Sequence, residues 1–198
     1  MGTSTREDGT ATFYAPDRVA WRNWLSEHHA TETSVWLIIY KKKSRIPSVY
    51  YGEAVDEALC LGWIDSKPNK RDADSYFQFF SRRNPKSNWS RVNKQKVERL
   101  SREGRMAPAG EEMVRIAQET GTWTALDEVE DLIVPDDLQQ TLILSPDALR
   151  HFTGFPPSSR RGILEWIFSA KRPSTRQKRI EETVTKAAQN IRANYYRT

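Results

Sequence analysis

Val35-Trp36-Leu37-Ile38-Ile39-Tyr40 sets the architecture of the N-terminal half. This run of β-branched and aromatic residues is too short for a typical helix and favours a strand covered on both faces. Ser75-Tyr76-Phe77-Gln78-Phe79-Phe80 has the same character and predicts the second strand of a hairpin. The first strand of that hairpin is expected to begin at Gly62-Trp63-Ile64-Asp65. These segments together predict a small antiparallel sheet.

Helices are expected around this sheet. Pro16 and Asp17 open the first helix, and a second covers residues 51–61, with Gly62 as its left-handed stop. Ser87 is the expected N-cap of a third helix that ends near Gly104.

The C-terminal third shows helical periodicity only. Its last helix is expected over residues 174–195, with Ile180, Val184 and Ala187 on a narrow apolar stripe. An acidic connector at residues 127–131 separates the two halves. The predicted class is therefore α+β: a disordered leader at residues 1–12, an α+β domain at 13–130, and a helical region at 131–198 packed on it.

The cysteine content and the lack of long apolar segments indicate the cellular compartment of the protein. The chain has 198 residues and a single cysteine, Cys60, so no internal disulfide can form and a reducing compartment is expected. The N-terminus lacks the apolar segment of a signal peptide, and no stretch is long and apolar enough for a membrane span. We therefore expect a cytoplasmic protein; the sequence does not indicate its oligomeric state.

Charge is distributed in blocks. Residues 66–106 contain twelve Lys and Arg against four Asp and Glu, hence +8, whereas residues 107–152 contain two against ten, hence −8. Residues 153–198 contain ten against three, hence +7. The basic blocks either attract an anionic partner or are neutralised internally by the acidic block.

Several motifs occur together and in order along the chain: Gly62-Trp63-Ile64-Asp65-Ser66, Phe79-Phe80-Ser81-Arg82-Arg83, Ser87-Asn88-Trp89-Ser90, Gly104-Arg105-Met106 and Ala170-Lys171-Arg172-Pro173. In combination they resemble the bacterial YdeI/OmpD-associated (bacteriocin-protection, OmdA-like) family, and the resemblance spans about residues 13–190. It implies a link to bacteriocin protection, but neither a reaction nor catalytic residues.

The first candidate site is a polar pocket with acidic and aromatic walls. Glu53 and Glu57 lie one helical turn apart, so they repel each other unless a cation lies between them. Either acid, with Asp65 and Lys43, is expected to line a pocket walled by Trp36, Trp63 and Tyr51. An enzymatic alternative uses Glu53 or Asp65 as the acid or base beside Lys43. The simpler alternative is that the acids only complement the helix N-terminus.

The second candidate is an anion-binding segment. Arg82 and Arg83 precede Ser87 and Trp89, which places cationic side chains at the expected start of a helix. Trp63 and Trp89 are expected to be partly exposed if a cleft lies here. A solvated capping segment is the alternative.

A third candidate is nucleic-acid binding. Cations at residues 41–45, 67–96 and 171–179 could neutralise phosphates while aromatic residues of the sheet stack on bases. Neither a cofactor motif nor a metal-ligand spacing is present, because His28 and His29 are adjacent and His151 is remote. We expect first a non-enzymatic binding or protection protein for an anionic small molecule or a protein partner, with an enzyme and a nucleic-acid binder as alternatives.

Overall fold

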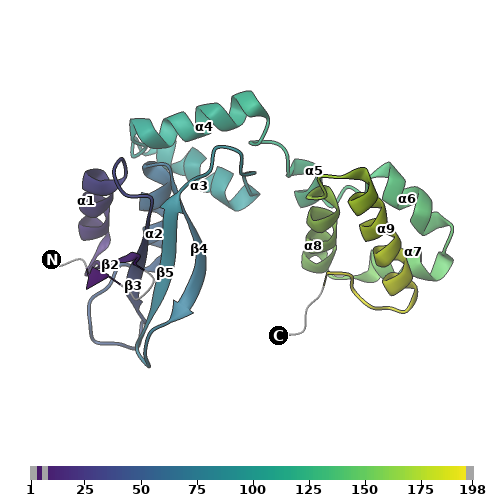
Figure 1. Cartoon of the computed structure of the whole chain (residues 1–198), viewed down its shortest axis with the longest axis horizontal. Helices are drawn as coiled ribbons and strands as arrows, with labels where there is room; N and C mark the ends of the chain where they lie inside the picture. The colour runs from purple at the N-terminus through teal and green to yellow at the C-terminus, as the bar shows by residue number, and fades with distance from the viewer. Residues whose placement is uncertain (1–3, 6–8, 195–198) are drawn as a thin grey trace. The chain divides into compact units, whose positions relative to one another are not determined.

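A computed structural model of the chain describes residues 4–5 and 9–194, and it divides into two compact units (Figure 1). The division between them falls between residues 124 and 125, whereas the sequence predicted it at residue 130. The α+β class is confirmed, with the strands in the N-terminal unit and helices alone in the described part of the C-terminal unit.

The N-terminal unit is a sheet with helices around it. Its elements are β1 (Ser4–Thr5), β2 (Ala11–Tyr14), α1 (Arg18–His28), β3 (Ser34–Tyr40), α2 (Tyr51–Cys60), β4 (Trp63–Lys70), β5 (Ser75–Arg82), α3 (Arg91–Arg102) and α4 (Pro108–Thr120). The strand order is β1-β2-β3-β5-β4, so β3 lies at the centre. The predicted β4–β5 hairpin is antiparallel, as is the β3–β5 pair. Figure 1 shows α1 beside the strands and α4 near one end of the sheet.

Two details of the sheet differ from the sequence prediction. Strands β2 and β3 run parallel, because the chain leaves β2, passes through α1 and returns as β3 in the same direction. The expected disordered leader lies partly outside the described residues, at 1–3 and 6–8. Of the rest, Ser4–Thr5 forms β1 and pairs with residues 11–12 of β2.

The main core lies between the sheet and its helices. Trp21 and Leu25 of α1 are fully buried, and Leu37 of β3 packs in the same cluster. The indole of Trp21 donates a hydrogen bond of 3.0 Å to the carbonyl of Ala54, which couples α1 to α2. Asp17 caps α1 as expected, accepting from the backbone N–H of Ala20 at 2.8 Å.

The end of α2 is clamped to the start of α4. Gly62 has a φ of +74°, the left-handed conformation expected after the helix. The N–H of Ala107 then bonds to the carbonyl of Cys60 at 3.0 Å. Gly110 passes so close that a Cβ there would lie 2.3 Å from the Cys60 oxygen. This close crossing fixes the path of the loop between α3 and α4.

The C-terminal unit is a small helical bundle. Its helices are α5 (Asp127–Glu130), α6 (Asp136–Ile143), α7 (Pro146–Gly154), α8 (Pro157–Phe168) and α9 (Pro173–Ala188). The expected acidic connector is thus largely α5. Helix α9 ends seven residues before the predicted position 195, which itself lies outside the described residues. Asn190 has a φ of +57°, a left-handed conformation that stops the helix.

Part of the charge segregation is neutralised inside this unit. Arg176 of α9 forms two hydrogen bonds, of 2.6 and 2.9 Å, with the carboxylate of Asp137 in the acidic block. Arg161 lies 3.7 Å from Glu130 and 3.3 Å from Glu165. Cations of the third block therefore pair with acids of the second, as the internal alternative predicted.

Candidate anion-binding pocket

Two adjacent acids on the inner side of α2 are buried. Asp56 is 7% exposed and Glu57 is 2% exposed, which is unusual for carboxylates because burial removes their hydration. Such groups need cationic partners, and both have them.

Glu57 is surrounded by three arginines from distant parts of the chain. Its Oε1 accepts from Arg18 Nε and Arg105 Nη2, and its Oε2 accepts from Arg22 Nη1 at 3.1 Å. Arg18 and Arg22 are one turn apart on α1, whereas Arg105 lies in the loop between α3 and α4. A further hydrogen bond of 3.2 Å, from Arg22 Nη2 to the carbonyl of Arg105, holds that loop against α1.

Asp56 is held by cations of α3. Lys96 and Arg99 each place a nitrogen 2.6 Å from its carboxylate, and Arg18 Nη2 lies 3.9 Å away. Burial alone would raise the pKa of Asp56, but the hydrogen bonds from Lys96 and Arg99 outweigh it and hold this pKa below its ordinary value. Asp56 therefore stays ionised at neutral pH and links α2 to α3.

An open pocket of about 450 Å³ lies against the Glu57 cluster. Among the described residues, the charged side chains that line it are Arg18, Arg22, Arg105 and Glu57, which gives three positive charges and one negative. The side chains of the three arginines are 33%, 30% and 26% exposed. Arg105 Nη1 also donates to Glu103 at 3.3 Å. Guanidinium groups in general are well suited to bind a carboxylate or phosphate.

The remaining residues of the first predicted pocket have separate partners. Tyr51 donates a hydrogen bond of 2.5 Å to Asp65, and Glu53 accepts from the backbone N–H of Tyr50 at 3.2 Å. Lys43 lies 3.9 Å from Asp74. Glu53, Asp65 and Lys43 thus have different partners, so these contacts give no support to the acid–base arrangement.

Tyr51 and Trp63 are placed by contacts outside the arginine pocket. Burial, followed by the hydrogen bond to Asp65, raises the pKa of the Tyr51 phenol well above its ordinary value. Trp63 is only 1% exposed, and its indole donates to the carbonyl of His29 at 3.3 Å. Glu57 is therefore the predicted residue that the structure places in the pocket.

The segment around Arg82 and Arg83 is occupied by internal contacts. Arg82 donates to the carbonyls of Glu32 and Ala30 at 2.7 and 2.6 Å. The Arg83 guanidinium lies 3.6 Å from the ring centre of Trp89 and donates to the carbonyl of Asn88 at 2.7 Å. Arg83 is 6% exposed, and this burial lowers its pKa to about 10.

The expected helix start at Ser87 was wrong. Helix α3 begins at Arg91, and Ser90 is its N-cap, with Oγ accepting from Asn93 N–H. Ser87 instead donates its hydroxyl to the carbonyl of Asn84 at 2.7 Å, within a turn. Trp89 is 2% exposed, so neither it nor Trp63 is the half-exposed wall that a cleft would require.

Sequence reasoning missed Arg18, Arg22 and Arg105. One signal was available: Asp56 and Glu57 are adjacent acids in an otherwise apolar part of α2, so at least one had to face the interior. The i,i+4 pair Arg18 and Arg22 offered cations on one helix face. No group of three or more His, Cys, Asp or Glu side chains suited to a metal ion occurs within residues 4–5 and 9–194.

The fold and the pocket together define a two-unit protein: a sheet domain with a cationic pocket, followed by a small helical domain. Residues 13–113, just over half of the chain, match the model of a family described as "Domain of unknown function (DUF8412)", and the chain belongs to that family. Residues 131–190 match the OmdA family, described as "Bacteriocin-protection, YdeI or OmpD-Associated". The resemblance noted in the sequence is confirmed over this second range. No curated protein and no solved structure matches the chain.

Proposed function

We propose that this protein is a non-enzymatic binding protein whose ligand is an anion held in the pocket of Arg18, Arg22 and Arg105. The observation that carries the proposal is the convergence of these three arginines on one buried carboxylate, Glu57. The pocket lining has three arginines and one acid, and outside the lining Arg105 also pairs with Glu103 at 3.3 Å while Arg18 lies 3.9 Å from Asp56.

Glu57 does not use all the N–H groups of the three arginines. Arg18 Nη2 makes no hydrogen bond with the described residues, but this nitrogen is itself buried, 3.9 Å from Asp56, so it is not counted among the donors that face the pocket. Each guanidinium has five N–H donors. Since both oxygens of Glu57 already accept from arginine, its role is to orient the guanidinium groups.

A protective role in the cytoplasm fits this activity. The description of the OmdA family speaks of bacteriocin protection, and such protection can proceed by sequestering or recognising a partner without chemistry. The lone Cys60 is buried, as suits a reducing compartment. No helix of the described residues is long and apolar enough to cross a bilayer.

The proposal is tested by titrating the full chain with inorganic phosphate and with citrate in a calorimeter at low ionic strength. The two arms distinguish a phosphate from a carboxylate ligand. Arg105→Gln and Arg18→Gln should weaken binding about ten-fold, because each removes a charge-assisted hydrogen bond. Arg102→Gln is the matched control, since Arg102 is exposed and its described contact is with the carbonyl of Glu98.

Glu57→Gln separates binding from folding. This change removes the negative charge of the pocket, so it should strengthen anion binding several-fold even though it weakens the fold. A purely structural cluster would show no such gain. Saturable binding that is equal in the parent, Arg18→Gln and Arg105→Gln would overturn the proposal, as would the absence of binding of both anions.

A further inference from the structure

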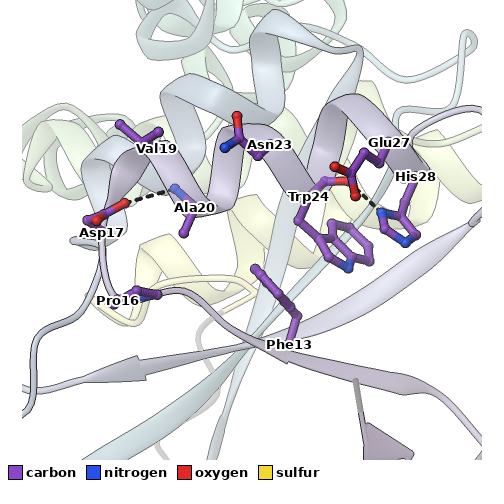
Figure 2. Close-up of a pocket in the computed structure, with 9 residues that line it drawn as sticks. All are labelled: Phe13, Pro16, Asp17, Val19, Ala20, Asn23, Trp24, Glu27 and His28. Atoms are coloured by element: carbon purple, nitrogen blue, oxygen red, sulfur yellow. Dashed lines mark hydrogen bonds between the residues drawn. The ribbon is translucent and has the colours of Figure 1, made fainter. Parts of the chain in front are cut away.

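The sheet of the N-terminal unit buries one of its two faces against helices. Side chains alternate between the faces along each strand. Leu37 of β3 and Phe80 of β5 belong to the core cluster that contains residues of α1 and α2. Phe13 of β2 points to the same side, where its ring stacks on Trp24 of α1 with the ring centres 5.4 Å apart (Figure 2). The alternate residues of these strands therefore form a second, outer face.

The outer face is aromatic. Five residues of β3 and β5 lie on it in register with one another: Trp36, Ile38, Tyr40, Phe77 and Phe79. Among the described residues, the main core cluster includes none of these five. The Trp36 ring meets the rings of Phe79 and Phe77 edge to face, at centre distances of 4.8 and 6.1 Å. Trp36 itself is 4% exposed, whereas Phe77 and Phe79 are partly exposed, so these two phenyl rings are accessible to a ligand.

The pattern of β5 is the reverse of that expected for a strand with one solvated face. Such a strand turns its apolar residues to the core and its polar residues to water. In β5 the polar Gln78 faces the core side, is 3% exposed and donates to the carbonyl of Ser66 at 3.1 Å. Its neighbours Phe77 and Phe79 occupy the outer face instead. Partly exposed rings on a sheet surface suit the stacking of flat groups.

Cations gather at one end of this face. The chain after β3 is joined there to the turn between β4 and β5, because Lys41 N–H donates to the carbonyl of Asp74 at 2.8 Å and Lys41 Nζ donates to the carbonyl of Ala73 at 2.9 Å. Residues 41–45 and 66–75 together contain seven Lys and Arg against two Asp, hence +5. This end of the sheet is therefore strongly basic.

The basic end borders the aromatic rings. The Arg71 guanidinium carbon lies 5.8 Å from the ring centre of Tyr40 and 5.9 Å from that of Phe77. Lys67 and Lys70 of β4 are exposed, and their side chains make no hydrogen bond or ion pair with the described residues. A ligand that covers the rings therefore comes within reach of several positive charges. Flat rings and repeated negative charges are the chemistry that this surface complements.

We infer that the outer face binds a single strand of nucleic acid, whose bases stack on Phe77 and Phe79 and whose phosphates lie at the basic end. Unpaired bases offer their ring faces for stacking, and the phosphates between them attract Lys and Arg. An acidic peptide would satisfy the cations but would leave the rings uncovered. The surface is separate from the arginine pocket, which is lined by α1, α2 and the α3–α4 loop.

The inference is tested on the full chain by fluorescence anisotropy with a fluorescein-labelled uridine decamer as the probe. The decamer should bind saturably, and Phe77→Leu and Phe79→Leu should each weaken binding about five-fold or more, because leucine is apolar but cannot stack on a base. Phe79→Tyr keeps the ring and should bind like the parent. Phe168→Leu is the matched control, since Phe168 is a 41% exposed phenylalanine of the helical unit.

Salt and charge variants test the phosphate contacts. Affinity should fall about twenty-fold between about 50 and 200 mM salt if roughly three phosphates are neutralised. The double variant Lys67→Gln/Lys70→Gln should make the slope of log affinity against log salt shallower by about 1.4, because two phosphate contacts are lost. Lys86→Gln is the control, since Lys86 is exposed and follows the opposite end of β5.

Four results would each overturn the inference: no saturable binding of the decamer, a flat salt response, an affinity unchanged in both leucine variants, or a loss in Phe79→Tyr as large as in Phe79→Leu. A ten-residue polyglutamate that displaces the labelled strand as well as unlabelled decamer does would also overturn it, since that peptide has charge without rings. Arg105→Gln should leave binding of the decamer unchanged, so failure of the anion-pocket proposal is read separately.

Discussion

Replacing Glu57 with alanine is expected to lower the free energy of unfolding of the N-terminal unit by about 3 kcal/mol. The carboxylate is 2% exposed and accepts hydrogen bonds from Arg18, Arg22 and Arg105. Its removal leaves three guanidinium groups close together, with Glu103 at 3.3 Å from Arg105 and Asp56 at 3.9 Å from Arg18 as the acids that remain near them.

The magnitude follows from the exposure of the cations. Removing one partner of a fully buried ion pair costs about 3–5 kcal/mol, because the remaining charge is left without solvation. Here the arginine side chains are 26–33% exposed, so water can reach part of each group. The loss should therefore lie near the lower end of that range.

Urea unfolding followed by tryptophan fluorescence measures this loss directly. Six of the seven tryptophans lie in the N-terminal unit, so the signal reports on that unit. With a slope of about 2 kcal/mol/M, a loss of 3 kcal/mol lowers the urea midpoint by roughly 1.5 M. The exposed control Glu98→Ala should stay within about 0.5 kcal/mol of the parent. A loss below about 1 kcal/mol in Glu57→Ala would refute the view that this carboxylate neutralises the arginine cluster.

Two further predictions concern backbone packing and pH. Gly110→Ala should destabilise the N-terminal unit by about 1–3 kcal/mol, because its Cβ would lie 2.3 Å from the Cys60 oxygen. The matched Gly52→Ala, whose added Cβ would have no atom within 4 Å, should stabilise the unit by about 0.4–1 kcal/mol. Urea midpoints of the two variants that shift in the same direction would contradict this prediction. The hydrogen bond from Arg176, partly offset by burial, lowers the pKa of Asp137, so its contribution is present above the ordinary carboxyl pKa of about 4 and is lost as pH falls below it. Scanning calorimetry from pH 7 to pH 3 measures this effect. Relative to the parent, Asp137→Asn should lose up to about 1 kcal/mol of its free energy of unfolding at neutral pH and none in acid. A difference between variant and parent that stays constant with pH would exclude the linkage.

The sequence predicted those parts of the fold that depend on local periodicity. The run at residues 35–40 became β3, Asp17 became the cap of α1, and Gly62 adopted the left-handed conformation. These features are decided by a few neighbouring residues, so pattern is sufficient to find them.

Long-range packing decided the rest. The parallel pairing of β2 with β3 depends on how α1 folds back on the sheet, and the four residues of β2 have too little periodicity to reveal it. Serines at 87 and 90 both suit an N-cap, and only the turn made by Asn84 assigns the role to Ser90.

The candidate site was predicted in part for the same reason. Glu57 was one of two acids predicted to line a polar pocket with Asp65 and Lys43, and the structure instead gives it three arginine partners. Their origin in α1 and in the α3–α4 loop could not be read from spacing, because those contacts span 35 to 48 residues. Arg82 and Arg83 drew attention as a basic pair, whereas their contacts with carbonyls and with Trp89 appear only after folding.

The main-chain hydrogen bond between Ala107 and Cys60 bears on the rate at which an anion would associate with the pocket. The loop that presents Arg105 is tied by main-chain bonds at both ends, since Arg105 N–H also bonds to the carbonyl of Leu100 at 3.0 Å. A loop restrained in this way loses little conformational entropy when an anion arrives. Capture would then be limited by diffusion and electrostatic attraction, so association should be fast, strongly slowed by salt, and free of a slow ordering phase.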